Sequence, residues 1–316
     1  MSALPPIVTL TLNPSVDVTY EIETLVDDRK VHADAYRYDP GGNGVNVARA
    51  LSRLQVPAHA CFVAAGEVVQ LLQRLLQRQV ANAHALWVDG ETRINVTLEQ
   101  RTPGAQYEVI GVGPRLDADV LARMTQTVEG LAGGGYAVLT GSLPPGLPAD
   151  TYTRLAAGLA TRGARVVLDM QGDALRAVLA SRPFLIKPNR YELEQLVGRA
   201  LPTLDAVRDA ACGVQAAGVE HVCVSLGADG ALLAHPHGVW HGRAPRVAVR
   251  STVGAGDSML AGLVAALARG DDAGDALRLG LACGSGTAAQ PGTELFDAQA
   301  LLALLRDARV QRLGAP

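Results

Sequence analysis

Residues 251–258, Ser-Thr-Val-Gly-Ala-Gly-Asp-Ser, place two glycines and a carboxylate directly before an apolar run. Residues 247–249, with the β-branched Val247 and Val249, predict a strand, and residues 259–268 predict a helix. A strand-to-helix turn points backbone N–H groups outward at the positive end of the helix dipole, which suits an anion. The candidate anion-binding N–H groups belong to Gly254, Ala255 and Gly256.

Asp257 follows this turn, where its charge would repel a bound phosphate unless it has a chemical task. A carboxylate there can take the proton of an attacking hydroxyl while N–H groups stabilise the charge on a transferred phosphoryl group. The alternative is that Asp257 only caps the helix and the glycines only turn the chain. Short glycine motifs match by chance, so the motif alone leaves both interpretations open.

Two further segments could contact a ligand with several hydroxyl groups. Residues 41–46, Gly-Gly-Asn-Gly-Val-Asn, include three glycines that lack side chains where a helix begins, and Asn46 can both donate and accept hydrogen bonds. The alternative there is a flexible loop with a helix cap. Residues 141–146, Gly-Ser-Leu-Pro-Pro-Gly, follow a predicted strand, where α/β sheets bind ligands. Taken alone, this second segment is better explained as an ordinary turn.

Residues 187–192, Lys-Pro-Asn-Arg-Tyr-Glu, place an amide and a carboxylate three positions apart on an opening helical turn. Asn189 and Glu192 together suit Mg²⁺ near nucleotide phosphates. A capping box fits the same spacing equally well. Residues 225–230, Ser-Leu-Gly-Ala-Asp-Gly, end a strand in a glycine turn that could touch phosphate or ribose.

Composition excludes several other classes of protein. A net charge of −3, a pI near 6.2 and 4% aromatic residues argue against nucleic acid or an anionic membrane as partner. Four widely spaced cysteines and an N-terminus without basic residues favour a cytoplasmic protein with free thiols. No P-loop motif is present, and the seven histidines are scattered, so we expect them to be solvated or paired locally rather than metal-bound.

The order of predicted elements indicates an α/β fold. Strands alternate with helices along most of the chain, which predicts a mainly parallel central sheet with helices on both faces. Two segments, about 14–38 and 92–112, interrupt this alternation with short strands. We expect them to form a small β-sheet lid inserted in a single domain spanning residues 1–316.

Taken together, these motifs resemble the ribokinase-like carbohydrate kinase family over essentially the whole chain. Residues 9–14, 92–95 and 251–258 are similar to its phosphosugar branch, which comprises minor-type 6-phosphofructokinases, 1-phosphofructokinases and tagatose-6-phosphate kinases. The resemblance implies a kinase dependent on ATP and Mg²⁺ that phosphorylates a ketohexose phosphate. Fructose 6-phosphate is favoured by the Lys30 and Arg93 spacing and by residues 38–42, whereas residues 92–95 lean toward 1-phosphofructokinase.

The resemblance also implies roles for individual residues. Asp257 would be the base, and residues 254–256 the anion hole. The sugar phosphate would contact Asp17, Lys30, Gly41, Gly42, Asn46, Arg93 and Ser142, with the phosphate clamped by Lys30 and Arg93. The nucleotide would contact Lys187, Asn189, Ser225, Gly227 and Gly230, and Glu192 would organise Mg²⁺.

Some expectations stay open. Asn43 stands where relatives usually carry Lys or Gly, and residues 290–294 differ from those of relatives around a monovalent-cation site involving Ser251 and Val253. A catalytically inactive sugar-phosphate sensor is the alternative from another class. The family's lids often pair between subunits, and apolar lid residues that need cover in water point to the same homodimer. Those residues are Val18, Tyr20 and Ile22 on one expected face, and Ile94, Val96 and Leu98 on another.

Overall fold

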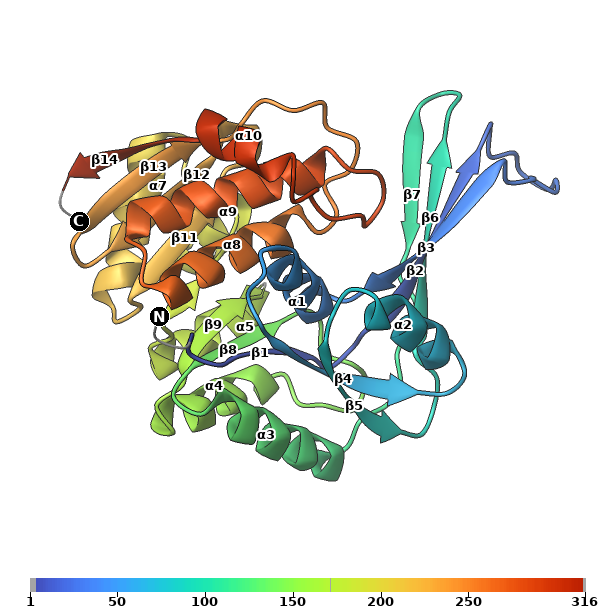
Figure 1. The fold of residues 1–316 in the computed structure, drawn as a ribbon, viewed down its shortest axis with the longest axis horizontal. Helices are drawn as coiled ribbons and strands as arrows, with labels where there is room; N and C mark the ends of the chain where they lie inside the picture. The colour runs from blue at the N-terminus through green and yellow to red at the C-terminus, as the bar shows by residue number, and fades with distance from the viewer. Residues whose placement is uncertain (1–3, 171, 315–316) are drawn as a thin grey trace.

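A sheet of ten strands forms the centre of the described residues, 4–170 and 172–314, in the computed structural model (Figure 1). In spatial order the strands are β14 (Arg309–Gly314), β13 (Gly238–Arg243), β12 (Ala231–His235), β11 (His221–Ser225), β10 (Leu185–Ile186), β9 (Arg165–Asp169), β8 (Tyr136–Thr140), β1 (Ile7–Thr11), β4 (His59–Ala65) and β5 (Asn82–Val88). Strands β11 to β5 run parallel, and β12, β13 and β14 add an antiparallel edge. The prediction of a mainly parallel sheet is confirmed.

Helices pack on both faces of this sheet (Figure 1). One face is covered by α1 (Asn43–Arg53), α8 (Ala255–Arg269), α9 (Ala273–Ala288) and α10 (Leu301–Asp307). The other is covered by α3 (Ala118–Ala132), α4 (Thr151–Thr161), α5 (Gly172–Val178), α6 (Arg190–Val197) and α7 (Leu204–Ala216). Side chains alternate along each strand, so Val8 joins one apolar layer and Ile7 the other. Both layers are therefore built from the same near-continuous apolar strands.

The predicted lid is a separate sheet of four strands that projects from the body at the upper right of Figure 1. Its strand order is β3 (Ala35–Gly41), β2 (Ser15–Ile22), β6 (Arg93–Gln100) and β7 (Ala105–Val109). Strands β2 and β6 run parallel, and the outer pairs are antiparallel. Helix α2 (Val68–Gln77) packs against the base of this sheet. The strands of this sheet fall within or next to the two segments predicted for a lid, about 14–38 and 92–112, and β3 continues to Gly41.

The lid has one apolar face and one polar face. Val18 lies opposite Val96, and Tyr20 lies opposite Leu98, so these side chains share one face rather than two. The expectation that Val18 and Ile22 need an external partner is wrong, because both are buried within the single chain. Other apolar-face side chains remain exposed: Tyr36, Tyr38, Ile94, Tyr107 and Val109.

Three predictions of secondary structure fail at the edges of the main sheet. Edge strands β5 and β14 were not expected, since both mix polar residues into weak alternation. The strand predicted at residues 247–249 is wrong. Strand β13 already pairs with β12 and β14, so its neighbour in sequence finds no free sheet edge there. Residues 244–249 are irregular instead.

Candidate active site

The N-terminus of α8 carries the motif identified from the sequence. Gly254 is its N-cap, with φ 74°, a left-handed conformation that a residue with a Cβ rarely adopts. No side chain caps this helix, so its first turn keeps N–H groups and the positive end of the dipole toward the adjoining cavity. The Ala255 N–H makes a long 3.3 Å bond to the Thr252 carbonyl.

Asp257 lies in this first turn, and its carboxylate is held by two asparagines of α1. Asn43 Nδ2 donates to Oδ1 at 3.0 Å, and Asn46 Nδ2 donates to Oδ2 at 2.9 Å. Burial, followed by the charge of Asp169, raises the pKa of Asp257 to about 6 against the opposing effect of these hydrogen bonds. The carboxylate does not cap α8, so the capping-only interpretation fails. Its pKa lies close to neutral pH, as a general base requires.

A buried arginine fixes the orientation of Asn46. Arg49 Nη1 donates to Asn46 Oδ1 at 2.9 Å, and also to the carbonyls of Pro40 and Thr293 at 3.1 and 3.3 Å. With its oxygen engaged, the Asn46 amide presents its NH₂ group to Asp257. Burial lowers the pKa of Arg49 to about 10, which leaves it charged at neutral pH. The sequence showed Arg49 only as a polar interruption of an apolar helix.

Lys187 forms a buried ion pair with Asp169 at the same edge of the sheet, with Nζ 3.1 Å from Oδ2. Burial alone would lower the pKa of Lys187, but the charge and hydrogen bond of Asp169, followed by the charge of Asp257, outweigh it and raise the pKa. A Cβ on Gly256 would lie 3.3 Å from this amine, so glycine gives it room. Sequence reasoning missed Asp169, although it ends a predicted strand where ligands bind.

These groups meet at one cavity of about 1060 Å³, a volume in the range that holds substrates. Eight residues predicted for the site line it: Ser142, Lys187, Asn189, Glu192, Ser225, Gly254, Gly256 and Asp257. Asn43 and Asp169 line it as well. Side chains from seven different elements or loops therefore face one space.

The base of the lid contributes a second carboxylate. Asp17 Oδ1 accepts hydrogen bonds from Ser15 Oγ at 2.7 Å and Asn95 Nδ2 at 2.8 Å. Burial raises the pKa of Asp17 against these bonds. A Cβ on Gly41 would overlap Asp17 Oδ1, and Gly42 has φ 107° at the N-cap of α1. Both glycines are therefore required by the local backbone and packing.

Arg93 and Ser142 are linked through Asn13. Arg93 donates from Nε and Nη2 to the Asn13 carbonyl at 3.1 and 2.8 Å. Asn13 Nδ2 donates to Ser142 Oγ at 3.1 Å. This chain of contacts joins the lid base to the loop after β8. In the sequence, Asn13 belongs to residues 9–14, which carry part of the family resemblance, but no role was predicted for it.

Lys30 lies apart from these groups. It is exposed in the connection between β2 and β3, at the distal end of the lid. Arg93 lies at the base, where it pairs with Ser15. Strand β2 separates the two ends by about 23 Å at 3.3 Å per residue. The predicted phosphate clamp requires Lys30 and Arg93 to lie close together. Within a single chain they do not.

Asn189 and Glu192 form the capping box that was the alternative to a metal site. The Asn189 side chain accepts from the Glu192 N–H, and Glu192 Oε2 accepts from the Asn189 N–H, each at 2.8 Å. Glu192 is nevertheless buried and lines the cavity. A cap and a metal-organising role use the same spacing, so Mg²⁺ binding here stays a prediction.

Gly227 and Gly230 lie in the turn after β11, where η2 spans Gly227–Asp229. A Cβ on Gly230 would overlap the Gly242 carbonyl, so packing against β13 already requires glycine there. Neither glycine is among the described residues that line the cavity. Ser225, which ends β11 just before this turn, does line it. The contact of both glycines with nucleotide stays a prediction.

Comparison with known proteins agrees with this geometry. Residues 9–299 match the pfkB family of carbohydrate kinases. The chain is 35% identical to 1-phosphofructokinase of Bacillus subtilis, covering 97% of this chain and 100% of that protein. It is also 35% identical to ATP-dependent 6-phosphofructokinase isozyme 2 of Escherichia coli, covering 95% and 98% of the two chains.

The fold also matches that of a solved structure. The crystal structure of Escherichia coli phosphofructokinase-2 with substrates and products superimposes with a TM-score of 0.91 at 34% identity, covering 95% of this chain and 98% of that one. The predicted ribokinase-like architecture is thereby confirmed. None of the helices in the described residues is long and apolar enough to cross a bilayer. The chain belongs to the pfkB family of carbohydrate kinases and is an ATP-dependent sugar-phosphate kinase of the phosphofructokinase type.

Proposed function

We propose that this kinase phosphorylates fructose 6-phosphate to fructose 1,6-bisphosphate, with Asp257 as the base. The observation that carries the proposal is the buried Asp257 carboxylate, which faces the cavity from the first turn of an uncapped helix and is held by Asn43 and Asn46. A carboxylate with a pKa near 6 is mostly ionised at pH 7 and can accept a proton.

The reaction follows from this placement. The acceptor hydroxyl oxygen forms a bond to the γ-phosphorus of ATP as the bond to the β,γ-bridging oxygen breaks, and the hydroxyl proton passes to Asp257. N–H groups at the start of α8, from Gly254 to Gly256, lie where they can stabilise charge on the transferred group. The Lys187 ammonium, which is held by Asp169, adds positive charge on the same side of the cavity.

The residues present also fit a divalent cation near the nucleotide. Glu192 and Asn189 supply oxygen atoms, the donor type that Mg²⁺ prefers, and both line the cavity. When bound, Mg²⁺ neutralises phosphate charge during transfer. We assign Lys187, Asn189, Ser225, Gly227 and Gly230 to the nucleotide side. A monovalent cation near Ser251 and Val253 stays a prediction.

We assign the acceptor sugar to the lid base and the loop after β8. Asp17, Asn46 and Ser142 provide polar side chains, and Gly41 and Gly42 allow close backbone approach. Arg93, already oriented by the Asn13 carbonyl, would meet the sugar's phosphate. Lys30 would join it only if a second subunit supplied it.

The choice of fructose 6-phosphate over fructose 1-phosphate depends on few contacts. A furanose ketohexose has CH₂O arms on both sides of its ring oxygen, so one pocket can hold either compound with its free arm at Asp257. The anomeric hydroxyl then lies at opposite ends, and leaving one polar contact unmade costs about 1–3 kcal/mol. Relatives of both kinds match this chain at the same identity.

Steady-state kinetics on fructose 6-phosphate, fructose 1-phosphate and tagatose 6-phosphate test the proposal. We expect the highest kcat/KM on fructose 6-phosphate. A tenfold or greater preference for either other sugar, about 1.4 kcal/mol, would overturn the assignment. Arg93→Ala should raise KM for the sugar phosphate and leave KM for ATP unchanged. A selective effect on ATP would instead place Arg93 on the nucleotide side.

We also infer that the protein is a homodimer paired through its lids. The exposed apolar lid residues Tyr36, Tyr38, Ile94, Tyr107 and Val109 lie on one face of the small sheet. Pairing such faces removes apolar area from water. The same arrangement offers a route for the distal loop of one lid, with Lys30, to reach a neighbouring site.

A further inference from the structure

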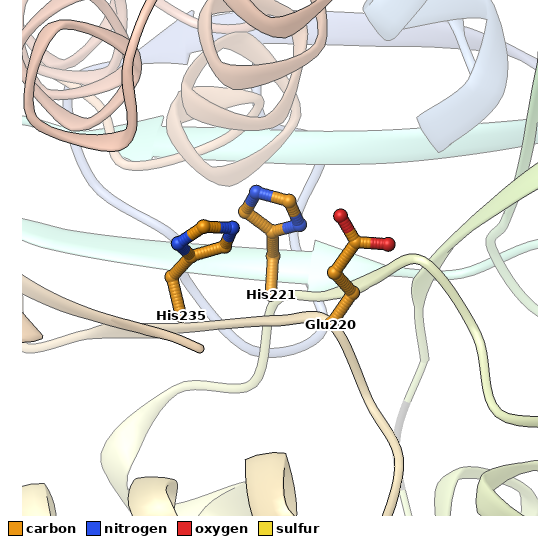
Figure 2. A group of neighbouring side chains, drawn as sticks. All are labelled: Glu220, His221 and His235. Atoms are coloured by element: carbon orange, nitrogen blue, oxygen red, sulfur yellow. The ribbon is translucent and has the colours of Figure 1, made fainter. Parts of the chain in front are cut away.

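Two histidines and a glutamate form a cluster at the amino end of β11 (Figure 2). The other end of this strand faces the cavity that Asp257 lines. His221 begins β11, Glu220 directly precedes it, and His235 ends the adjacent β12. Ligand atoms from the three side chains lie within 4.8 Å of one another. Among the residues that the structure describes, no other group of three His, Cys, Asp or Glu side chains meets this criterion. The sequence predicted histidines that are solvated or paired locally and gave no sign of this cluster, which forms because β11 and β12 pair in the fold.

The cluster opens into a cavity of its own, of about 600 Å³. Its lining combines charged and aromatic groups: Tyr136, Arg165, Phe184, Glu220, His221, His235, His237, Trp240, Asp271 and Asp272, with Leu267 and Ala273. It shares no lining residue with the larger cavity beside Asp257. Strand β11 runs between the two cavities: His221 at its start lines the smaller cavity, and Ser225 at its end lines the larger one. The smaller cavity gives an ion an entry path from solvent.

We propose that Glu220, His221 and His235 bind a divalent transition-metal ion of the Zn²⁺ type. Two imidazoles and one carboxylate, with a fourth position left to water, are a common ligand set for zinc. Nitrogen donors favour such ions over Mg²⁺ or Ca²⁺, so this site is chemically distinct from the one predicted at Glu192. Ligand atoms around a tetrahedral zinc lie about 3.4 Å apart for bonds of 2.1 Å. The exposed Glu220 side chain is free to move that far inward.

His221 already has the outer contact that orients metal-bound histidines. Its Nδ1 lies 3.2 Å from the Phe184 carbonyl, which holds the N–H on Nδ1 and leaves the lone pair of the neutral ring on Nε2. The His221 ring also packs against Phe184 and His235, with centroids 4.6 Å from each. A ring fixed in this way loses little freedom when a metal binds.

The ring of His235 is held less firmly than that of His221. His235 Nδ1 accepts only a long 3.3 Å bond from the His237 N–H, so its tautomer can change at small cost.

Titration of the full chain with Co²⁺, read by its visible absorption, and with Zn²⁺, read by calorimetry, tests the proposal. Millimolar Mg²⁺ is kept present so that oxygen sites are already filled. We expect one ion per chain. His235→Gln should weaken binding at least tenfold, and Glu220→Gln at least threefold. His32→Gln, which removes an exposed lid histidine, is the matched control and should leave the affinity unchanged.

His221 is buried, so His221→Gln can perturb folding, and the conclusion depends on the half-buried His235 and exposed Glu220 instead. Absence of binding by the unaltered chain would overturn the proposal, as would equal affinity in His235→Gln. Loss of binding in His59→Gln would also overturn it. His59 Nδ1 lies 2.9 Å from His84 Nε2, and this pair is the alternative imidazole site.

Discussion

Asn43 Nδ2 donates a 3.0 Å hydrogen bond to Asp257 Oδ1. The two residues are brought together by α1 and the first turn of α8, which meet at the cavity. This contact bears on the proposed base, because a hydrogen bond to the ionised carboxylate favours that form.

Asn43→Ala should move the acid limb of the pH profile. Protonated Asp257 cannot accept the hydroxyl proton, so kcat/KM of the unaltered enzyme should fall as pH decreases through about 6. Removing the Asn43 hydrogen bond destabilises the carboxylate and raises its pKa, which shifts the limb to higher pH. A bond of about 1.4 kcal/mol to a charged group corresponds to one pH unit. Asn82→Ala, at the exposed start of β5, is the control. An acid limb that stays in place in Asn43→Ala would contradict this role.

Asp257→Asn should abolish the base while keeping the size of the side chain. We expect turnover to fall on the order of 10²–10⁴-fold, with modest change in KM for the sugar. Asp119→Asn is a matched control, since Asp119 also lies in the first turn of a helix but on the surface of α3. Initial rates at saturating substrate make the measurement. Near-normal turnover in Asp257→Asn would remove Asp257 from the mechanism.

Glu192→Gln separates the capping role from the metal role. Glutamine can still accept from the Asn189 N–H, so the capping box and the start of α6 should persist. Loss of the charge should raise the Mg²⁺ concentration that gives half-maximal rate. The check is a Mg²⁺ titration at fixed ATP. An unchanged titration would leave Glu192 with a capping role only.

The predicted dimer can be tested by placing a charge on each face of the lid sheet in turn, with the polar face as the control for the apolar face. Val109→Asp places a charge on the apolar face, and Gln106→Asp places one on the polar face of the same strand. Sedimentation should give a dimer for the unaltered chain and Gln106→Asp, and a monomer for Val109→Asp. A monomer at micromolar concentration for the unaltered chain would contradict the dimer.

If Lys30 acts across the dimer, two inactive variants should restore each other. A site in a mixed dimer of Lys30→Ala and Asp257→Asn can combine an intact Asp257 with Lys30 from the other subunit. Random mixing makes half of the dimers mixed, each with one intact site of two, so about a quarter of normal activity should return. Activity no greater than the sum of the separate variants would place Lys30 outside a shared site.

The sequence predicted the parallel sheet, the small second sheet and eight of the residues that line the cavity, because these depend on local patterns. Apolar strands, glycine turns and a carboxylate after Gly254 each leave a signal within a few residues. It did not predict Asp169, whose importance comes from its ion pair with Lys187 across two strands. Nor did it predict the link from Arg49 to Asn46, since arginine is seldom buried without paired partners.

The edges of the main sheet and the faces of the lid sheet were the least predictable parts of the structure. Strands β5 and β14 exist because the sheet offers them an edge, and the strand expected at 247–249 fails for lack of one. The side chains of β2 and β6 share a face only through their register, which no single segment encodes. The same holds for the His221 and His235 pair, which strand pairing alone creates.

Both sheets place an N-terminal strand in their interior. Ile7 of β1 pairs with Tyr136 of β8, and Ser15 of β2 pairs with Arg93 of β6. Such distant pairings slow folding, since a long loop must close before they form. During synthesis at 5–20 residues per second, the first strand waits on the order of ten seconds for β8 to emerge from the ribosome. Strand β4 emerges earlier and can pair with one edge of β1, but the other edge stays unpaired until β8 is made. This interval is when chaperone contact or aggregation competes with folding.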